Sequence, residues 1–283
     1  MNAAHPVTVA SLQQMKRDGT KIVGVVVYDR QMAQVVDRAG VDIVSVGDSV
    51  GVNMWGQESD LDVTLEQMLL ACTAVRRGVQ RALVSCDMPY GPLQAGPSAA
   101  LQAATLLVKQ GGADMLKLDA AADFPEAVRA IVQSGIPVWA QFGITPHTAA
   151  RYGGMSKAGP EMSAGLKDRF IEEAKLLEEA GAALLDFTNS GPVAGPAVTQ
   201  AVSIPVIGGL GGGPWLDGRI RALVAAIGYT AAALDDTVER YANVARITLD
   251  AITTFAEDVR AGRQIRGGIP VRQIRTADPS GPP

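Results

Sequence analysis

Cysteine and histidine are scarce in this chain, with two residues of each among 283. Cys72 and Cys86 have neither the number nor the spacing of a disulfide framework or a zinc site, and Cys86 lies in an apolar run typical of a core residue. Basic residues are not in excess either, because 25 Lys and Arg face 29 Asp and Glu, for a net charge of −4. This charge balance argues against a nucleic-acid partner, which requires a basic face.

Long hydrophobic runs are also missing. No segment approaches the roughly 18 apolar residues that a membrane-spanning helix needs. The first residues, from Met1 to Pro6, lack the basic start and apolar stretch of a secretory signal. These features predict a cytoplasmic protein with no membrane partner. The chain contains 47% hydrophobic residues, enough for the core of one large α/β domain.

Short apolar runs alternate with helical patterns over most of the sequence. Seven or eight such units in about 230 residues favour a (β/α)8 TIM barrel. The alternative is a doubly wound open sheet, which would require a Gly-rich turn after the first strand, where this chain has Asp29-Arg30-Gln31. The strands are predicted over residues 22–28, 41–46, 82–86, 115–118, 137–142, 183–187, 205–208 and 225–234.

Two segments interrupt the alternation. Residues 143–163 are long and rich in Gly and Pro, and after the fifth strand of a barrel they would form either a lid or an ordinary surface loop. A helix is predicted over residues 238–260. We therefore expect one barrel domain with its C-terminal helix over residues 1–262, and an extended, partly disordered tail over residues 263–283. The tail is either a linker or an arm that packs on a neighbouring subunit.

Aspartates stand at the ends of three predicted strands, at Asp48, Asp87 and Asp119. Because the carboxyl ends of parallel strands meet at one rim of a barrel, these side chains should gather there, with Lys117 nearby. Carboxylates are the ligands that a hard divalent cation such as Mg²⁺ prefers. Each aspartate alone could instead cap a helix or form a surface ion pair, but their shared placement predicts a metal site that holds an anionic substrate.

Several short motifs can be compared with known families in their order along the chain. They are Val27-Tyr28-Asp29, Val46-Gly47-Asp48-Ser49-Val50-Gly51, Asp87-Met88-Pro89, Lys117-Leu118-Asp119, Gly143-Ile144-Thr145-Pro146 and Ile204-Pro205-Val206-Ile207-Gly208. In this order and spacing the chain resembles the ketopantoate hydroxymethyltransferase family. That family belongs to the isocitrate lyase and phosphoenolpyruvate mutase group of barrels, and the resemblance runs from about Val7 to Gly268.

The resemblance implies a ligand set and a reaction. Asp48 and Asp87 would bind Mg²⁺, Asp119 would assist through water, and Ser49 and Lys117 would hold the carboxylate of a 2-oxo acid. In the family a C3 proton is removed from 3-methyl-2-oxobutanoate, and the metal-bound enolate adds to methylenetetrahydrofolate to give ketopantoate, a step of pantothenate biosynthesis. Family members form ring-like homo-oligomers, often decamers, so a homo-oligomer is expected.

The loop after the seventh strand is rich in glycine and includes Gly211 and Gly212. Glycines there permit close approach of the backbone, which suits a pterin or a phosphate. By resemblance we therefore predict that Gly211 and Gly212 contact the folate co-substrate.

The residues expected to transfer protons depart from the family pattern. Thr188 stands where the family has its proton-abstracting glutamate, and a neutral hydroxyl is no general base near pH 7. Gln141 stands at a family histidine and cannot titrate. Asp186 precedes Thr188 by two residues and shares its side of the strand, so it is either a displaced base or a structural acid. His147 is either a solvated loop residue or a lid residue that replaces a lost acid–base group.

Three functions remain open from the sequence. The one we expect is a Mg²⁺-dependent hydroxymethyltransferase or aldol-type enzyme that acts on 3-methyl-2-oxobutanoate or a related 2-oxo acid. The second is a C–C lyase, decarboxylase or hydrolase of the same barrel group. The third is a catalytically inactive barrel that binds a metabolite.

Overall fold

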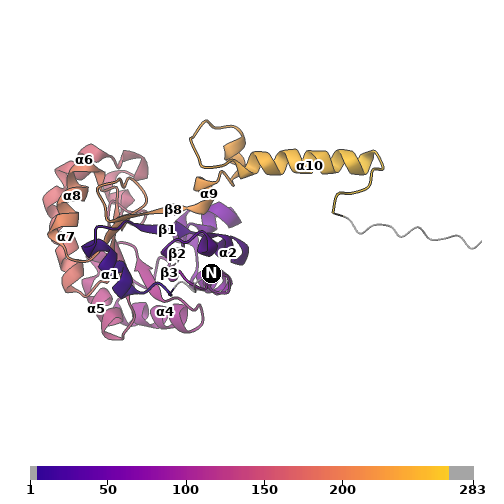
Figure 1. Ribbon diagram of the computed structural model, residues 1–283. Helices are drawn as coiled ribbons and strands as arrows, with labels where there is room; N and C mark the ends of the chain where they lie inside the picture. The colour runs from indigo at the N-terminus through magenta and orange to yellow at the C-terminus, as the bar shows by residue number, and fades with distance from the viewer. Residues whose placement is uncertain (1–4, 268–283) are drawn as a thin grey trace, which may run out of the picture. The chain divides into compact units, whose positions relative to one another are not determined.

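The computed structural model describes residues 5–267, and these form a closed barrel of eight parallel strands followed by a further helical unit (Figure 1). Each strand pairs with the next along the chain, and the last strand pairs with the first, Ile22 lying opposite Gly218. The predicted TIM barrel is therefore confirmed. The strands are β1 (Ile22–Val26), β2 (Ile43–Val46), β3 (Leu83–Asp87), β4 (Met115–Leu118), β5 (Val138–Gly143), β6 (Leu184–Thr188), β7 (Val206–Gly208) and β8 (Gly218–Ala222).

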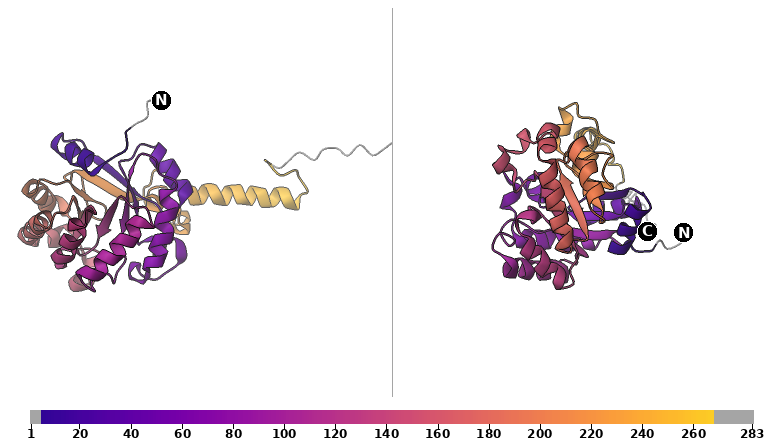
Figure 2. Two further views of the ribbon diagram at one scale, coloured as in Figure 1. Left: turned by 90° about the horizontal axis from the view of Figure 1, so that it is seen from below. Right: turned by 90° about the vertical axis from the view of Figure 1, so that its left-hand side faces the viewer.

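Helices surround the ring of strands, as Figure 2 shows. The helix that precedes β3 begins at a capping box, where the Thr64 hydroxyl accepts from the Gln67 backbone N–H and the Gln67 side chain accepts from the Thr64 backbone N–H. No helix within residues 5–267 is both long and apolar enough to cross a membrane. The α-helices are α1 (Val9–Arg17), α2 (Arg30–Arg38), α3 (Leu65–Arg76), α4 (Pro97–Lys109), α5 (Pro125–Gln133), α6 (Pro160–Gly165), α7 (Lys167–Glu179), α8 (Gly191–Ala201), α9 (Leu223–Ala226) and α10 (Val244–Arg260).

The barrel interior is apolar at the end where the strands begin. Side chains alternate along each strand between the interior and the surrounding helices. Lys117, Gln141 and Asp186 each follow a buried apolar residue by two positions on the same strand. The same alternation therefore directs their side chains into the interior. The apolar layer thus forms the floor of a polar cavity at the carboxyl ends of the strands. The layer consists of Leu12, Ile22, Ile43, Leu83, Met115, Trp139, Leu184, Ile207 and Ile220.

The prediction of an eighth strand over residues 225–234 is wrong. β8 is formed earlier, by Gly218–Ala222, and the predicted segment instead contains the end of α9 and a 3-10 turn at Ala231–Leu234. The strand was missed because its arginines break the apolar pattern: Arg219 and Arg221 are exposed while Ile220 is buried in the inner core. β1 is also shorter than predicted and ends at Val26.

The described chain divides into two compact units, one ending at Ala226 and the other beginning at Ile227. The second unit contains α10, which begins at Val244 rather than at residue 238. The residues before it form a local turn instead, in which the Asp236 carboxylate accepts from the backbone of Val238 and pairs with Arg240. Residues 268–283 of the predicted tail lie outside the described residues. The single domain over residues 1–262 and the homo-oligomer stay predictions.

Candidate active site

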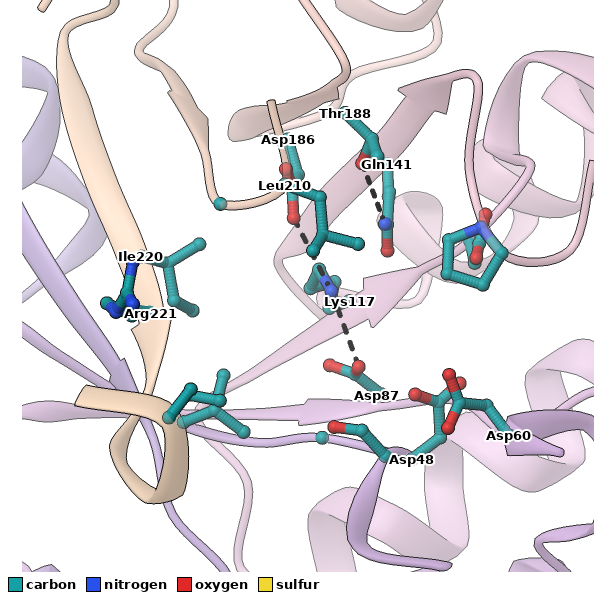
Figure 3. Close-up of a pocket in the computed structure, with 18 of the residues that line it drawn as sticks. Asp48, Asp60, Asp87, Lys117, Gln141, Asp186, Thr188, Leu210, Ile220 and Arg221 are labelled. Carbon is teal, nitrogen blue, oxygen red and sulfur yellow. Dashed lines mark hydrogen bonds and ion pairs between the residues drawn. The ribbon is translucent and has the colours of Figure 1, made fainter. Parts of the chain in front are cut away.

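A cavity of about 520 Å³ opens at the carboxyl ends of the barrel strands (Figure 3). The strand ends bring the predicted aspartates together here, as the parallel arrangement requires. The predicted residues Ser49, Lys117, Gln141, Asp186 and Thr188 line the same cavity. Its acidic side chains are Asp48, Asp60, Asp87, Asp119 and Asp186.

Lys117 joins two buried carboxylates at the centre of the cavity. Its ammonium lies 3.3 Å from Oδ2 of Asp87 and 3.4 Å from Oδ2 of Asp186. Burial alone would lower the pKa of Lys117, but these two aspartates raise it above its ordinary value, so the lysine stays charged. Burial raises the pKa of Asp87 to about 7, although Lys117 opposes the rise, and burial also raises the pKa of Asp186.

His147 lies in the loop after β5, close to Asp48 and Asp119. Its Nε2 is 3.4 Å from Oδ2 of Asp48 and its Nδ1 is 3.9 Å from Oδ2 of Asp119. Burial would lower the pKa of this imidazole, but Asp48 and Asp119 raise it above its usual range. Because the His147 side chain is only 2% exposed, the alternative of a solvated loop residue is wrong.

Asp60 is a member of the site that the sequence did not reveal. It begins a 3-10 turn, Asp60–Asp62, and burial together with the charge of Asp48 raises its pKa to about 6. No strand ends at this position, and the neighbouring pair Ser59 and Asp62 forms a capping box, which indicates only a turn. The sequence therefore carries no local signal that Asp60 faces the cavity.

Gln141 and Thr188 form a neutral pair on the neighbouring strands β5 and β6. The amide of Gln141 donates to the hydroxyl of Thr188 over 2.9 Å, and both side chains are buried. Asp186 precedes Thr188 by two residues on β6. Its Oδ2 forms an ion pair with Lys117, and its Oδ1 has no hydrogen-bond partner among residues 5–267. Of these three residues, Asp186 alone can exchange a proton near neutral pH.

Ser49 follows Asp48 at the end of β2 and belongs to a small network of neutral groups. Its hydroxyl is 3.0 Å from the hydroxyl of Tyr28, which also accepts from the amide of Asn53 over 3.1 Å. Burial raises the pKa of Tyr28 to about 12, so the phenol remains protonated. Ser49 is thus held in place with hydrogen-bonding capacity toward the cavity.

The loop after β7 reaches the cavity through residues other than the predicted glycines. Gly209 and Leu210 line the cavity, whereas Gly211 and Gly212 are not among its lining residues. Gly211 has a φ of +63°, and a Cβ there would lie 2.6 Å from Oδ1 of Asn189. This glycine is therefore required by close packing of the loop.

The donor set of the cavity suits a divalent cation. Buried Oδ1 atoms of Asp87, Asp119 and Asp186 have no hydrogen-bond partner within the described chain, and unpaired buried carboxylate oxygens are unfavourable. Within residues 5–267, no group of three or more His, Cys, Asp or Glu side chains is placed, as it stands, so that it could hold a metal ion. Two carboxylates from the protein are nevertheless sufficient for Mg²⁺, which keeps several waters and commonly binds substrate oxygens.

Comparisons with known proteins agree over nearly the whole chain. Residues 6–264 match the family described as ketopantoate hydroxymethyltransferase. The chain is 37% identical over 255 residues to the 3-methyl-2-oxobutanoate hydroxymethyltransferase of Salinibacter ruber, covering 90% of this chain and 95% of that relative.

Solved structures are similar to the chain in fold. A 2,3-dimethylmalate lyase, a member of the PEP mutase/isocitrate lyase superfamily, has a TM-score of 0.57 at 17% identity, with 93% of this chain and 99% of that one covered. A phosphonopyruvate hydrolase in complex with oxalate and Mg²⁺ has a TM-score of 0.58 at 12% identity, with 97% and 92% covered.

Proposed function

Because the chain belongs to the ketopantoate hydroxymethyltransferase family, we propose that it is a metal-dependent enzyme that forms a C–C bond beside the keto group of a 2-oxo acid. The proposed substrate is 3-methyl-2-oxobutanoate or a close relative, and the proposed one-carbon donor is methylenetetrahydrofolate. One observation carries this proposal: Asp48, Asp87 and Lys117 line a single cavity in which buried carboxylate oxygens have no hydrogen-bond partner among residues 5–267.

Asp48 and Asp87 are the proposed ligands of a Mg²⁺ ion, and Asp119 assists from further away. When bound, the ion would polarise the keto group and stabilise the negative charge of an enolate. Lys117 is the fixed positive charge of the cavity and, together with Ser49, would hold the substrate carboxylate. These five residues bind and orient the 2-oxo acid.

Asp186 is the proposed proton acceptor in place of the family glutamate. Its side chain is 4% exposed, burial raises its pKa, and one of its oxygens is free to accept a proton from substrate C3. Lys117 favours the carboxylate form that acts as the base. Thr188 and Gln141 would position the substrate through hydrogen bonds without moving its proton.

The neutral Gln141–Thr188 pair also favours a second candidate, a lyase that acts on a 2-oxo acid. Cleavage of the bond between C3 and C4 produces the enolate directly. No C3 proton is removed, so no base is needed at the Thr188 position. In this alternative, Asp186 would accept a proton from a substrate hydroxyl rather than from C3.

Deuterium exchange at C3 of 3-methyl-2-oxobutanoate tests the first function against the second. With Mg²⁺ in D2O, the protein is expected to catalyse this exchange, which proton NMR follows, and EDTA should stop it. Turnover with methylenetetrahydrofolate should then yield ketopantoate. Absence of exchange would exclude the hydroxymethyltransferase, and cleavage within a panel of 4-hydroxy-2-oxo acids would support the lyase. Mg²⁺ binding without any turnover would favour an inactive metabolite-binding barrel.

A further inference from the structure

The two ring nitrogens of His147 lie beside Asp48 and Asp119, and neither has a hydrogen-bond partner in the described part of the chain. Its side chain is only 2% exposed, so bulk water does not satisfy these atoms. A buried imidazole in this state is uncommon, because buried polar groups are nearly always paired. The surroundings of the ring therefore indicate that a bound group completes its coordination.

The orientation of the imidazole indicates which group this is. Nδ1 faces Oδ2 of Asp119 at 3.9 Å, and the same oxygen accepts from the backbone N–H of His147 at 3.3 Å. Tyr90 packs against the ring at 88°, with the ring centroids 5.3 Å apart. Nε2, at the far side of the ring, points to Asp48. In metal-binding histidines one nitrogen is typically oriented by a carboxylate while the other binds the ion, and Asp119 is the carboxylate beside Nδ1 here.

The separation of Nε2 from Asp48 is also close to that of two ligands on one ion. Ligands at roughly 2.1 Å from an ion and at a right angle to each other lie about 3.0 Å apart. Oδ2 of Asp48 and Nε2 of His147 are 3.4 Å apart, and both side chains are mostly buried. The two atoms are therefore about as far apart as two ligands of one ion.

We propose that Nε2 of His147 is a ligand of the divalent cation held by Asp48 and Asp87, and that Asp119 orients the imidazole. Nitrogen ligands favour transition ions over Mg²⁺, which prefers oxygen, so this site selects an ion such as Co²⁺ or Mn²⁺. This inference rests on the proposed function, since it requires a cation at the two aspartates. It changes which ion the site prefers and assigns Asp119 the role of a positioning residue.

Pulsed electron paramagnetic resonance of the Mn²⁺-loaded protein tests the coordination directly. Electron spin echo envelope modulation should reveal a directly bound ¹⁴N, and labelling the protein with ¹⁵N-histidine should replace that signal with one from ¹⁵N. The chain contains one other histidine, His5, so His5→Gln is the matched control and should retain the signal. His147→Gln should lose it. The labelling experiment needs no variant and so remains decisive if His147→Gln fails to fold.

Metal affinity gives a second readout. In His147→Gln, the affinity for Co²⁺ should fall at least about 10-fold relative to the affinity for Mg²⁺, whereas His5→Gln should leave the ratio unchanged. Bound Mn²⁺ without any histidine nitrogen signal would overturn this inference alone and would indicate that His147 is a protonated partner of Asp48. Failure of Mn²⁺, Co²⁺ and Mg²⁺ to bind at all would overturn both this inference and the proposed function.

Discussion

The amide of Gln141 donates a 2.9 Å hydrogen bond to the hydroxyl of Thr188 across neighbouring strands of the barrel. Both residues stand at positions where the family resemblance predicts ionisable groups, histidine and glutamate respectively. Each neutral side chain provides a hydrogen-bond partner for the other in this buried site. Neither member of this pair can serve as the base, and Asp186, which lines the cavity on the same strand, is the proposed proton acceptor.

Replacement of Asp186 tests this displacement. Asp186→Asn should reduce C3 deuterium exchange of 3-methyl-2-oxobutanoate by at least about 100-fold, because it removes the general base. Thr188→Val should reduce the exchange by less than about 10-fold, because the hydroxyl positions the substrate without accepting its proton. Proton NMR of both variants at saturating Mg²⁺ provides the comparison. Equal losses in the two variants would mean that Thr188 takes part in proton transfer.

Metal binding should depend on the aspartates at the ends of β2 and β3. Asp87→Asn should weaken Mg²⁺ binding by at least about 100-fold in isothermal titration calorimetry, because the loss of a ligand costs more than the loss of an outer partner. Asp48→Asn should act in the same direction. Asp250→Asn, at an exposed position on α10, is the control and should bind as the wild type does. Unchanged affinity in both cavity variants would place the ion elsewhere.

Much of the barrel could be predicted because its strands are short apolar runs with regular spacing. The gathering of Asp48, Asp87 and Asp119 followed from the same regularity, since parallel strands end at one rim. The family followed instead from the order and spacing of short motifs that resemble it. β8 was missed because exposed arginines flank the buried Ile220, so the strand does not show up as an apolar run in the sequence. The burial of Asp60 and His147 depends on how loops fold over the cavity. Contacts between residues distant in sequence determine that folding, and no local pattern records them.

Lys117 should contribute strongly to stability as well as to substrate binding. Lys117→Met leaves the carboxylates of Asp87 and Asp186 buried without a cation, and removal of one partner from a buried ion pair typically costs about 3–5 kcal/mol. Lys109→Met, at an exposed position on α4, should change the free energy of unfolding by less than about 0.5 kcal/mol. Urea denaturation in the presence of EDTA measures both.

The double variant Lys117→Met with Asp186→Leu completes this test. Removing one of the stranded carboxylates should recover part of the stability lost in Lys117→Met, because an apolar residue replaces an unpaired charge. If Lys117→Met alone is as stable as the Lys109→Met control, both aspartates must already be protonated in the folded protein and need no cation.

Asp60 should destabilise the metal-free protein at neutral and higher pH. Its pKa rises from 3.8 to about 6 on folding, so the folded state holds a proton that the unfolded state releases. Stability is therefore lost as pH rises from about 4 to about 6, and the loss persists above this range. Asp60→Asn removes this loss. It should raise the free energy of unfolding by about 1–2 kcal/mol at pH 8, after allowance for the partial exposure of the side chain.

The gain from Asp60→Asn should be much smaller at pH 4, where the aspartate is protonated in the folded protein and roughly 40% protonated in the unfolded chain. Urea denaturation at pH 4 and pH 8 with EDTA measures the difference. Added Mg²⁺ should reduce the gain at pH 8, because a cation beside Asp48 favours the charged form of Asp60. A gain of the same size at both pH values would mean that the asparagine acts through hydrogen bonding or packing, and the negative charge of Asp60 would then have no role in the stability of the site.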